Sequence, residues 1–414
     1  MSPAWRPHSQ NCWHCCQKRN VRRQSRPLQR RNRKPGDVQR HQRKPPGRRA
    51  QARRANVRPR ARLRPRLRPG LPPRRVVDMR VMITGATGFV GYHTAQALLA
   101  AGHEVSVLVR SVDKLLNLFG ENRVHQVVRG DVTDPQQVAR ALDGCDAVVH
   151  SAAMVSTHAA DADRVWRTNV EGTQWVVGGA VERGLTRVVH VSSVTALYDP
   201  HADVLTEASP PGRARNAYGR SKVACEEYVR DLQAQGASVA ITYPAQVIGP
   251  DDPGFTEPHQ GLQLLLKGIV PCTSSGTQYV DVRDLAEVHR RLLEESTPGN
   301  RYVMGGHYLD WQALAEALEA VTGRRLLKLP LPGLAARLGG QLYDRVSRHL
   351  PVDLPFGLEA MEYATRWVPL DNSRVEEELE FQFRPLQDSL HDTLAWLYRA
   401  GYITRRQAGR AVDL

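Results

Sequence analysis

Short apolar runs alternate with longer segments of helical periodicity from Arg80 onward. The runs are rich in Val and Ile and are nearly continuous, as in strands that are buried on both faces. The predicted strands are 80–84, 104–109, 124–128, 146–150, 187–191 and 239–243, and the predicted helices are 89–101, 135–142, 162–182 and 216–235. Strands that alternate with helices predict an α/β fold with a doubly wound parallel sheet.

The regular alternation of strands and helices ends after Pro244, and the predicted elements become shorter. We expect a helix from about Asp284, a strand over 302–304, and helices over 311–321 and 386–400. This predicts that 79–243 forms the sheet domain and that 244–414 is mainly a smaller lobe for the substrate, partly interleaved with the sheet. The fairly apolar segment 326–342 is predicted to be buried core, with a lipid-facing lid as the alternative.

Charge divides the chain into a basic tail and a mildly acidic body. Residues 1–78 hold 25 Lys and Arg against two acidic residues, so this segment carries +23 and the remainder carries −7. The tail also contains 11 Pro and neither Phe nor Tyr, a composition that predicts disorder. Such a tail binds polyanions weakly and without sequence preference, so no specific nucleic-acid partner is expected. An alternative is that translation starts at or near Met79.

Several classes of protein are excluded or disfavoured by the composition. The chain has no apolar run long enough to span a membrane, and no secretory signal follows the N-terminal charges. Six Cys without framework spacing favour a reducing, cytoplasmic location. Cys12, His14, Cys15 and Cys16 lack a second pair of ligands, so no metal site is expected.

A glycine-rich turn, Thr-Gly-Ala-Thr-Gly-Phe-Val-Gly, occupies 84–91 between the first strand and its helix. Glycines at such a turn let backbone N–H groups approach a pyrophosphate at the helix N-terminus. The residues expected to contact the cofactor here are Gly85, Thr87, Gly88, Phe89, Val90 and Gly91. The spacing differs from the usual G-x-G-x-x-G, and a purely steric turn is the alternative interpretation.

Arg110 follows the second strand, where NAD-binding proteins place an acidic residue for the ribose 2′-hydroxyl. A guanidinium fits a 2′-phosphate instead, so the sequence favours NADP over NAD. The alternative is an exposed arginine with no ligand.

Tyr218 and Lys222 are spaced by four residues, so both side chains lie on one face of the predicted helix. A nearby ammonium favours the phenolate, which predicts a lowered pKa for Tyr218 and a role in acid–base catalysis. Ser193 and Thr195 end the fifth strand, where a hydroxyl can hold a substrate carbonyl.

These motifs together resemble the extended branch of the short-chain dehydrogenase/reductase superfamily, over essentially all of 79–400. The resemblance includes four further segments: Gly130-Asp131-Val132, His150-Ser151-Ala152-Ala153, Asn169-Val170-Glu171-Gly172-Thr173 and Val280-Asp281-Val282-Arg283-Asp284. It implies a Rossmann sheet, adenine contacts from Asp131 and Val132, and contacts near the nicotinamide ribose from Ser151, Ala152 and Ala153. The Arg-Pro that often follows the sixth strand is Tyr243-Pro244 here, so the assignment of Tyr243 to the cofactor loop is less direct.

Within that branch, the segments 192–197 and 108–110, with the C-terminal 384–397, are similar to the dihydroflavonol-reductase-like group. The resemblance implies hydride transfer between NADP(H) and a carbonyl or secondary alcohol of a small organic substrate. It assigns proton transfer to Tyr218, ribose binding to Lys222 and orientation of the substrate oxygen to Ser193. A homodimer is also expected.

Three alternatives stay open at this stage. One is a nucleotide-sugar epimerase or dehydratase with bound NAD; its catalytic hydroxyl would stand where this chain has Val194, although Thr195 could substitute. Another is a steroid- or sterol-type dehydrogenase. The third is a non-enzymatic protein that binds NADP, or polyanions through the basic tail.

Overall fold

The computed structural model describes residues 78–156, 159–295, 300–346 and 357–412, all within one compact unit, Leu71–Leu414. The predictions for the basic tail and for its cysteines fall outside these residues.

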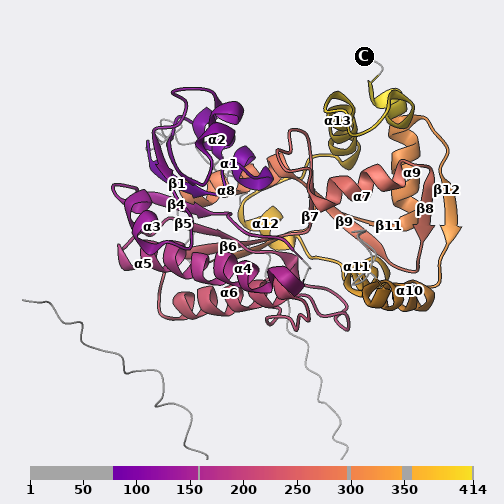
Figure 1. Cartoon of the computed structure of the whole chain (residues 1–414), viewed down its shortest axis with the longest axis horizontal. Helices are drawn as coiled ribbons and strands as arrows, with labels where there is room; N and C mark the ends of the chain where they lie inside the picture. The colour runs from indigo at the N-terminus through magenta and orange to yellow at the C-terminus, as the bar shows by residue number, and fades with distance from the viewer. Residues whose placement is uncertain (1–77, 157–158, 296–299, 347–356, 413–414) are drawn as a thin grey trace, which may run out of the picture. The chain divides into compact units, whose positions relative to one another are not determined.

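A seven-stranded sheet, entirely parallel, forms the centre of this unit (Figure 1). Its strands are β1 (Arg80–Thr84), β2 (Glu104–Val109), β3 (Gln126–Arg129), β4 (Ala147–His150), β5 (Val188–Val191), β6 (Val239–Pro244) and β10 (Arg301–Met304). Their order is β10-β6-β5-β4-β1-β2-β3, so the direction of winding reverses between β1 and β4. The predicted doubly wound parallel sheet is confirmed. A ligand crevice is expected beyond the carboxyl ends of β1 and β4, because strand order reverses there.

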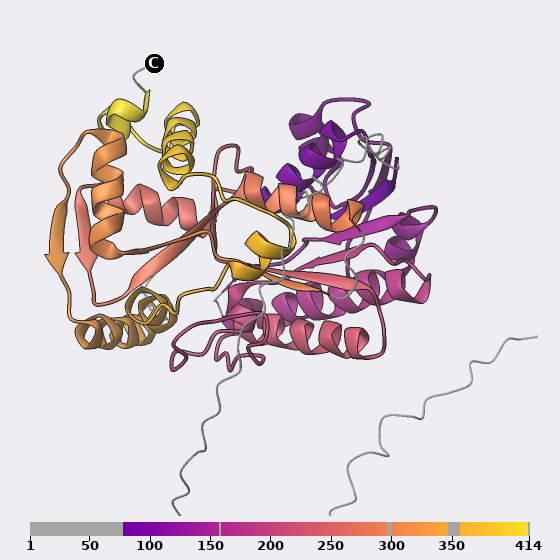
Figure 2. The same ribbon diagram turned by 180° about the vertical axis from the view of Figure 1, so that it is seen from behind.

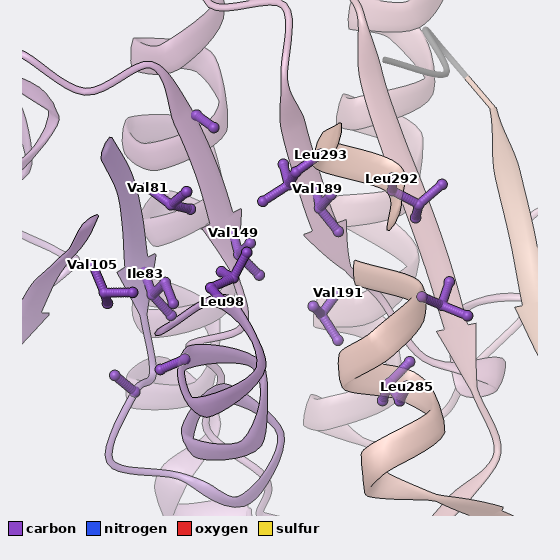
Figure 3. Packing of buried hydrophobic residues seen from close by; sticks show 14 of the residues in the cluster. Val81, Ile83, Leu98, Val105, Val149, Val189, Val191, Leu285, Leu292 and Leu293 are labelled. Atoms are coloured by element: carbon purple, nitrogen blue, oxygen red, sulfur yellow. The ribbon is translucent and has the colours of Figure 1, made fainter. Parts of the chain in front are cut away.

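Helices cover both faces of this sheet (Figures 1 and 2). One face packs against α1 (Phe89–Ala100), α2 (Val112–Phe119) and α8 (Val282–Glu294). Figure 3 shows Leu98 of α1 and Leu285 of α8 meeting Val and Ile side chains of the strands. The other face packs against α3 (Pro135–Leu142), the helix formed by α4 (Ala162–Trp166) to α5 (Gly179–Glu182), and α6 (Ala217–Ala234). Between α4 and α5 the helix contains two π turns, Arg167–Glu171 and Gln174–Gly178.

A second lobe has its own core, built around Ile248, Leu266 and Leu314. Its strands are β7 (Gln246–Ile248), β9 (Gly276–Asp281) and β11 (His307–Asp310) in one sheet, and β8 (Ile269–Cys272) with β12 (Leu327–Pro330) in another. Its helices are α7 (Glu257–Leu265), α9 (Trp311–Thr322), α10 (Gly333–Val346), α11 (Leu358–Thr365), α13 (Leu386–Arg399) and α14 (Arg405–Ala408). Helix α12 (Ser373–Glu378) contacts β10 of the central sheet.

The prediction that 326–342 is buried core is wrong. Leu326 is buried, but Leu327, Leu334, Leu338 and Leu342 are each at least half exposed. The segment is apolar, but the rest of the protein does not cover the faces of β12 and α10 that carry these leucines.

Candidate active site

The glycine-rich turn forms a tight cradle at the N-terminus of α1. Gly85 has φ +76°, which favours glycine, and its carbonyl accepts a hydrogen bond from the Gly88 N–H at 2.8 Å. A Cβ on Gly91 would stand 2.2 Å from the Gly85 carbonyl oxygen, so only glycine allows this approach. Gly88 is exposed, and α1 has neither a capping side chain nor an acidic residue in its first turn. The positive end of the helix dipole is therefore not neutralised locally, which suits a pyrophosphate.

The loop after β4 packs directly onto this cradle. The Ser151 hydroxyl donates to the Thr84 carbonyl oxygen at 2.9 Å, and the Ala152 N–H donates to the Thr84 hydroxyl at 3.3 Å. A Cβ on Gly85 would lie 2.8 Å from the Ala152 nitrogen. The segment 151–153 therefore lies beside the turn at the predicted crevice, with Ala153 exposed.

Arg110 and Asp131 stand at the ends of β2 and β3, two neighbouring strands. Arg110 is exposed and has no hydrogen bond or ion pair within the described parts of the chain, so its guanidinium is available to an anion. Ser111 beside it caps α2, accepting a hydrogen bond from the Lys114 N–H at 3.2 Å. Asp131 Oδ1 accepts from the Thr133 N–H and hydroxyl, which fixes the turn, and Val132 is buried against Gly172.

Ser193, Tyr218 and Lys222 come together from β5 and α6. Asn216 caps α6, and Tyr218 and Lys222 follow on its first two turns. The Lys222 ammonium lies 5.9 Å from the centroid of the Tyr218 ring and donates to the Val191 carbonyl oxygen at 3.4 Å. Ser193 lies close enough to Tyr218 to affect the pKa of its phenol, and the Ser193 hydroxyl lies 3.2 Å from that of Thr195. The three predicted catalytic side chains therefore form one cluster.

The prediction that the pKa of Tyr218 is lowered is wrong. Burial raises the pKa of Tyr218 to about 12, and Ser193 only partly opposes that shift. Burial also lowers the pKa of Lys222, whose ammonium stands over the ring rather than at the hydroxyl. The phenol is thus neutral at physiological pH, the form that can donate a proton.

Two histidines lie behind the cluster, in β4 and β5. His150 and His190 stack with their ring centroids 5.6 Å apart, and both are buried. Burial, helped by the charge of Lys222, lowers the pKa of His150 to about 3 and also lowers that of His190. Both rings are therefore neutral, and neither competes with Lys222 as a cation in the crevice.

Sequence reasoning missed Glu226, one helical turn beyond Lys222. Its carboxylate is fully buried and accepts hydrogen bonds from Ser192, Arg230 and Tyr243, at 3.1, 2.5 and 2.5 Å. This network ties α6 to the end of β5 and to β6, behind the Ser193–Tyr218–Lys222 cluster. The spacing of four residues from Lys222 was the available signal, because it places Glu226 on the same helix face.

The side chain of Tyr243, a predicted cofactor residue, points into the interior. It is completely buried, and its hydroxyl is bound to Glu226. Its side chain therefore belongs to the network behind the catalytic cluster and is not presented to a cofactor.

Asn169 connects the two sides of the site from the first π turn. Its amide donates to the Met154 carbonyl oxygen at 3.0 Å and to the Ser221 hydroxyl at 2.8 Å, and its oxygen accepts from the Met154 N–H at 2.7 Å. The loop after β4 is thereby fixed to the helix that carries Tyr218 and Lys222. Ser221 in turn donates to the Tyr218 carbonyl oxygen.

A family model matches this arrangement over residues 81–305, more than half of the chain, and its description is the NAD dependent epimerase/dehydratase family. The chain belongs to this family. The matched segment includes the glycine cradle, Arg110, the Ser193–Tyr218–Lys222 cluster and the last strand of the central sheet. Members of the family are NAD(P)-dependent enzymes, and the cradle described above fits the pyrophosphate of such a dinucleotide.

Individual relatives within the family differ in the reactions that their names describe. A dihydroflavonol 4-reductase-like protein of Synechocystis is 27% identical over 78% of this chain and 95% of its own length. The sterol demethylase protein B of Methylococcus capsulatus is also 27% identical, over 78% of this chain and all of its own. A crystal structure of the dTDP-glucose 4,6-dehydratase DesIV of Streptomyces venezuelae, a double mutant with NAD bound, has a TM-score of 0.61 at 26% identity, covering 78% of this chain and 98% of that one. These names support an NAD(P)-dependent oxidoreductase and leave the substrate open.

No helix in the described part of the chain is both long and apolar enough to cross a membrane.

Proposed function

We propose that this protein is an NADP(H)-dependent reductase that interconverts a carbonyl and a secondary alcohol on a small organic substrate. The observation that carries the proposal is the cluster of Ser193, Tyr218 and Lys222 at the carboxyl end of the sheet, with a neutral Tyr218. The glycine cradle at the start of α1 belongs to the same crevice, so a bound dinucleotide would extend toward these side chains.

Each catalytic side chain has a distinct task in this proposal. The dinucleotide, when bound, supplies or accepts the hydride. Tyr218 donates its phenolic proton to the carbonyl oxygen during reduction and takes it back during oxidation. Ser193 donates a hydrogen bond to the same oxygen and orients the substrate. Lys222, whose ammonium lies 5.9 Å from the centroid of the Tyr218 ring, binds the nicotinamide ribose.

The preference for NADP over NAD rests on Arg110. Its exposed guanidinium has no partner in the described chain and follows β2, the strand whose end faces the adenosine ribose in folds of this kind. A 2′-phosphate would accept two hydrogen bonds from it, whereas a bare hydroxyl would gain little. We propose further cofactor contacts from Gly85, Thr87, Gly88, Phe89, Val90, Gly91, Asp131, Val132, Ser151, Ala152 and Ala153.

A nucleotide-sugar dehydratase or epimerase with NAD is the second candidate, favoured by the NAD-bound dehydratase of similar fold. Val194, where such enzymes place a catalytic hydroxyl, is apolar and buried here. The relationship to sterol demethylase protein B keeps sterol-type dehydrogenation as a variant of the first candidate.

The test is oxidation of NADPH by the purified protein with a panel of carbonyl compounds, followed at 340 nm. We expect turnover that prefers NADPH to NADH, and a loss of roughly a thousandfold in Tyr218→Phe with NADPH binding retained. Ser156→Ala, another hydroxyl of the described chain, is the control and should keep its rate. Turnover at the normal rate in Tyr218→Phe contradicts the mechanism. Tightly held NAD, identified by mass spectrometry of the ligand that co-purifies, supports the second candidate instead.

We also propose that the protein is a homodimer of the cytoplasm. Trp166 and Trp175, on the helix from α4 to α5, are 45% and 44% exposed, and large aromatic side chains are typical of protein interfaces. Light scattering after size exclusion tests the dimer. Trp175→Glu should yield monomers if this face forms the contact.

A further inference from the structure

Helix α10 is built with its large apolar side chains on the outside. Leu334, Leu338 and Leu342 are 64%, 55% and 63% exposed, whereas Ala336 and Gly340 are buried. At 100° per residue, the three leucines and Val346 lie within about 120° of one face of the helix. An ordinary surface helix has the opposite arrangement, with large apolar residues facing the core.

The leucines face outward because α10 packs very closely on α11. A Cβ on Gly340 would stand 2.8 Å from Leu358 Cα, so no larger residue fits on this side. Arg337 secures the same side by donating to the Thr365 hydroxyl at 2.9 Å. The face with the small residues is thus fixed against the protein, and the leucines are held outward by the packing itself.

Exposed apolar side chains also occur on the two-stranded sheet that precedes α10 in the chain. Leu327 and Leu329 of β12 are 60% and 49% exposed, and Ile269 of β8, which pairs with Leu327, is 54% exposed. These three side chains share one face of the sheet because Leu327 and Ile269 are in register and Leu329 is two residues further. We call these three residues and the four apolar residues of α10 the leucine face. So many exposed large apolar side chains on two successive elements indicate an interaction surface.

The segment 324–346, which carries most of the leucine face, is basic in sequence, although Lys328 is paired with Glu319 at 2.9 Å. Residues 324–346 contain five Arg and Lys and a single acidic residue, Asp344, within a body that carries −7. Arg345 lies on the same side of α10 as Leu334 and Leu338, and Arg325 is exposed just before β12. A helix with an exposed face of leucines, in a segment with exposed arginines, suits a position in a membrane interface.

We propose that the leucine face docks this protein on the surface of an anionic phospholipid bilayer. The leucines enter the boundary between headgroups and acyl chains, and Arg345 and Arg325 contact lipid phosphates. A second copy of the chain fits this surface less well, because a two-fold contact would bring the same basic residues against each other. The docking does not depend on the reaction proposed above.

Helix α11 connects this surface to the segment that follows Ser193. Helix α11, which packs on α10, carries Tyr363, whose ring centroid is 4.5 Å from that of Tyr198, five residues beyond Ser193. A docked protein would therefore hold its second lobe against the bilayer.

Vesicle binding by the full chain tests the proposal, with Leu338→Glu compared against Leu116→Glu. Leu116 is a matched control, since it is also an exposed leucine of a helix, α2. Sedimentation with vesicles of phosphatidylcholine and phosphatidylglycerol is measured in 0.5 M NaCl, where screening over about 4 Å suppresses binding by the basic tail. We expect Leu338→Glu to weaken binding at least about tenfold and Leu116→Glu to change it less than about twofold.

Hydrogen exchange locates the contact independently of the tail. We expect added vesicles to slow exchange of the amides in 327–346. Equal binding of both variants, or no added protection in 327–346, overturns the proposal. Protection that appears without vesicles as protein concentration rises also overturns it, because the occupant is then a second copy.

Discussion

Replacing Gly91 with alanine tests the glycine cradle directly. The added Cβ would stand 2.2 Å from the Gly85 carbonyl oxygen and 2.5 Å from its carbon, and both are backbone atoms that no rotamer change can move. The first turn of α1 must therefore withdraw from the Gly85 loop by about 1 Å, since contacts below 3 Å between such atoms are not tolerated. The N–H groups at the start of α1 move with it.

The expected loss of NADPH affinity follows from the hydrogen bonds that the displaced N–H groups no longer donate to the pyrophosphate. Hydrogen bonds to a charged group contribute roughly 1.5–3 kcal/mol each, and misplacing one or two of them should cost about 2–4 kcal/mol of binding free energy. That corresponds to a rise of about 30- to 1000-fold in the Kd for NADPH. Overpacking should also lower the free energy of unfolding by about 1–3 kcal/mol.

Gly261→Ala provides the matched control. Gly261 also lies within a helix, α7, but a Cβ there would meet nothing within 4 Å. Alanine should stabilise that helix by about 0.5–1 kcal/mol and leave cofactor affinity unchanged. The assay is titration of NADPH fluorescence, with the thermal midpoint measured on the same samples. A folded Gly91→Ala protein that binds NADPH with normal affinity would refute the assignment of this turn to the pyrophosphate.

Three further predictions concern the rest of the site. Arg110→Asp should weaken the binding of NADPH about tenfold or more and leave the binding of NADH nearly unaffected, because a carboxylate repels the 2′-phosphate. An unchanged ratio of the two Kd values would show that Arg110 does not contact the cofactor. Because the pKa of Tyr218 is raised to about 12, the protonated phenol that donates the proton persists as pH rises. The kcat/KM for reduction at saturating NADPH should therefore not fall on the alkaline side below pH 10. A fall near pH 9 would mean that Lys222 acts on the Tyr218 hydroxyl. Glu226→Gln should lower the free energy of unfolding by roughly 2–4 kcal/mol, because Arg230 and Tyr243 lose a buried anionic acceptor. An unchanged midpoint of urea unfolding would contradict a stabilising role of Glu226.

Much of the sheet and of the site could be predicted because their signals are local. Strand β1 and helix α3 have the predicted bounds, and the helix from α4 to α5 spans the predicted 162–182. The periodicity of apolar residues and the residues of tight turns involve only a few neighbours along the chain, so one sequence is enough to detect them. The same holds for Gly85 to Gly91 and for the spacing of Tyr218 and Lys222, where residues close in sequence must be close in space.

Other features depend on which segments meet, and these were decided only by the tertiary structure. Helix α2 was missed, although Ser111 caps it, and Glu226 was missed because its partners Ser192 and Tyr243 come from two different strands. The direction of the Tyr218 pKa shift was wrong because spacing places an ammonium near the ring but does not reveal how far burial removes the phenolate from water.

Helix α10 shows the distinction most clearly. Its sequence determines that Leu334, Leu338 and Leu342 share one face, because the period of the helix is a local property. Whether that face is covered depends on where α11 packs, and the close contact at Gly340 turns the leucines outward. Periodicity thus tells which residues lie together, while burial is a property of the neighbours that the fold brings to them.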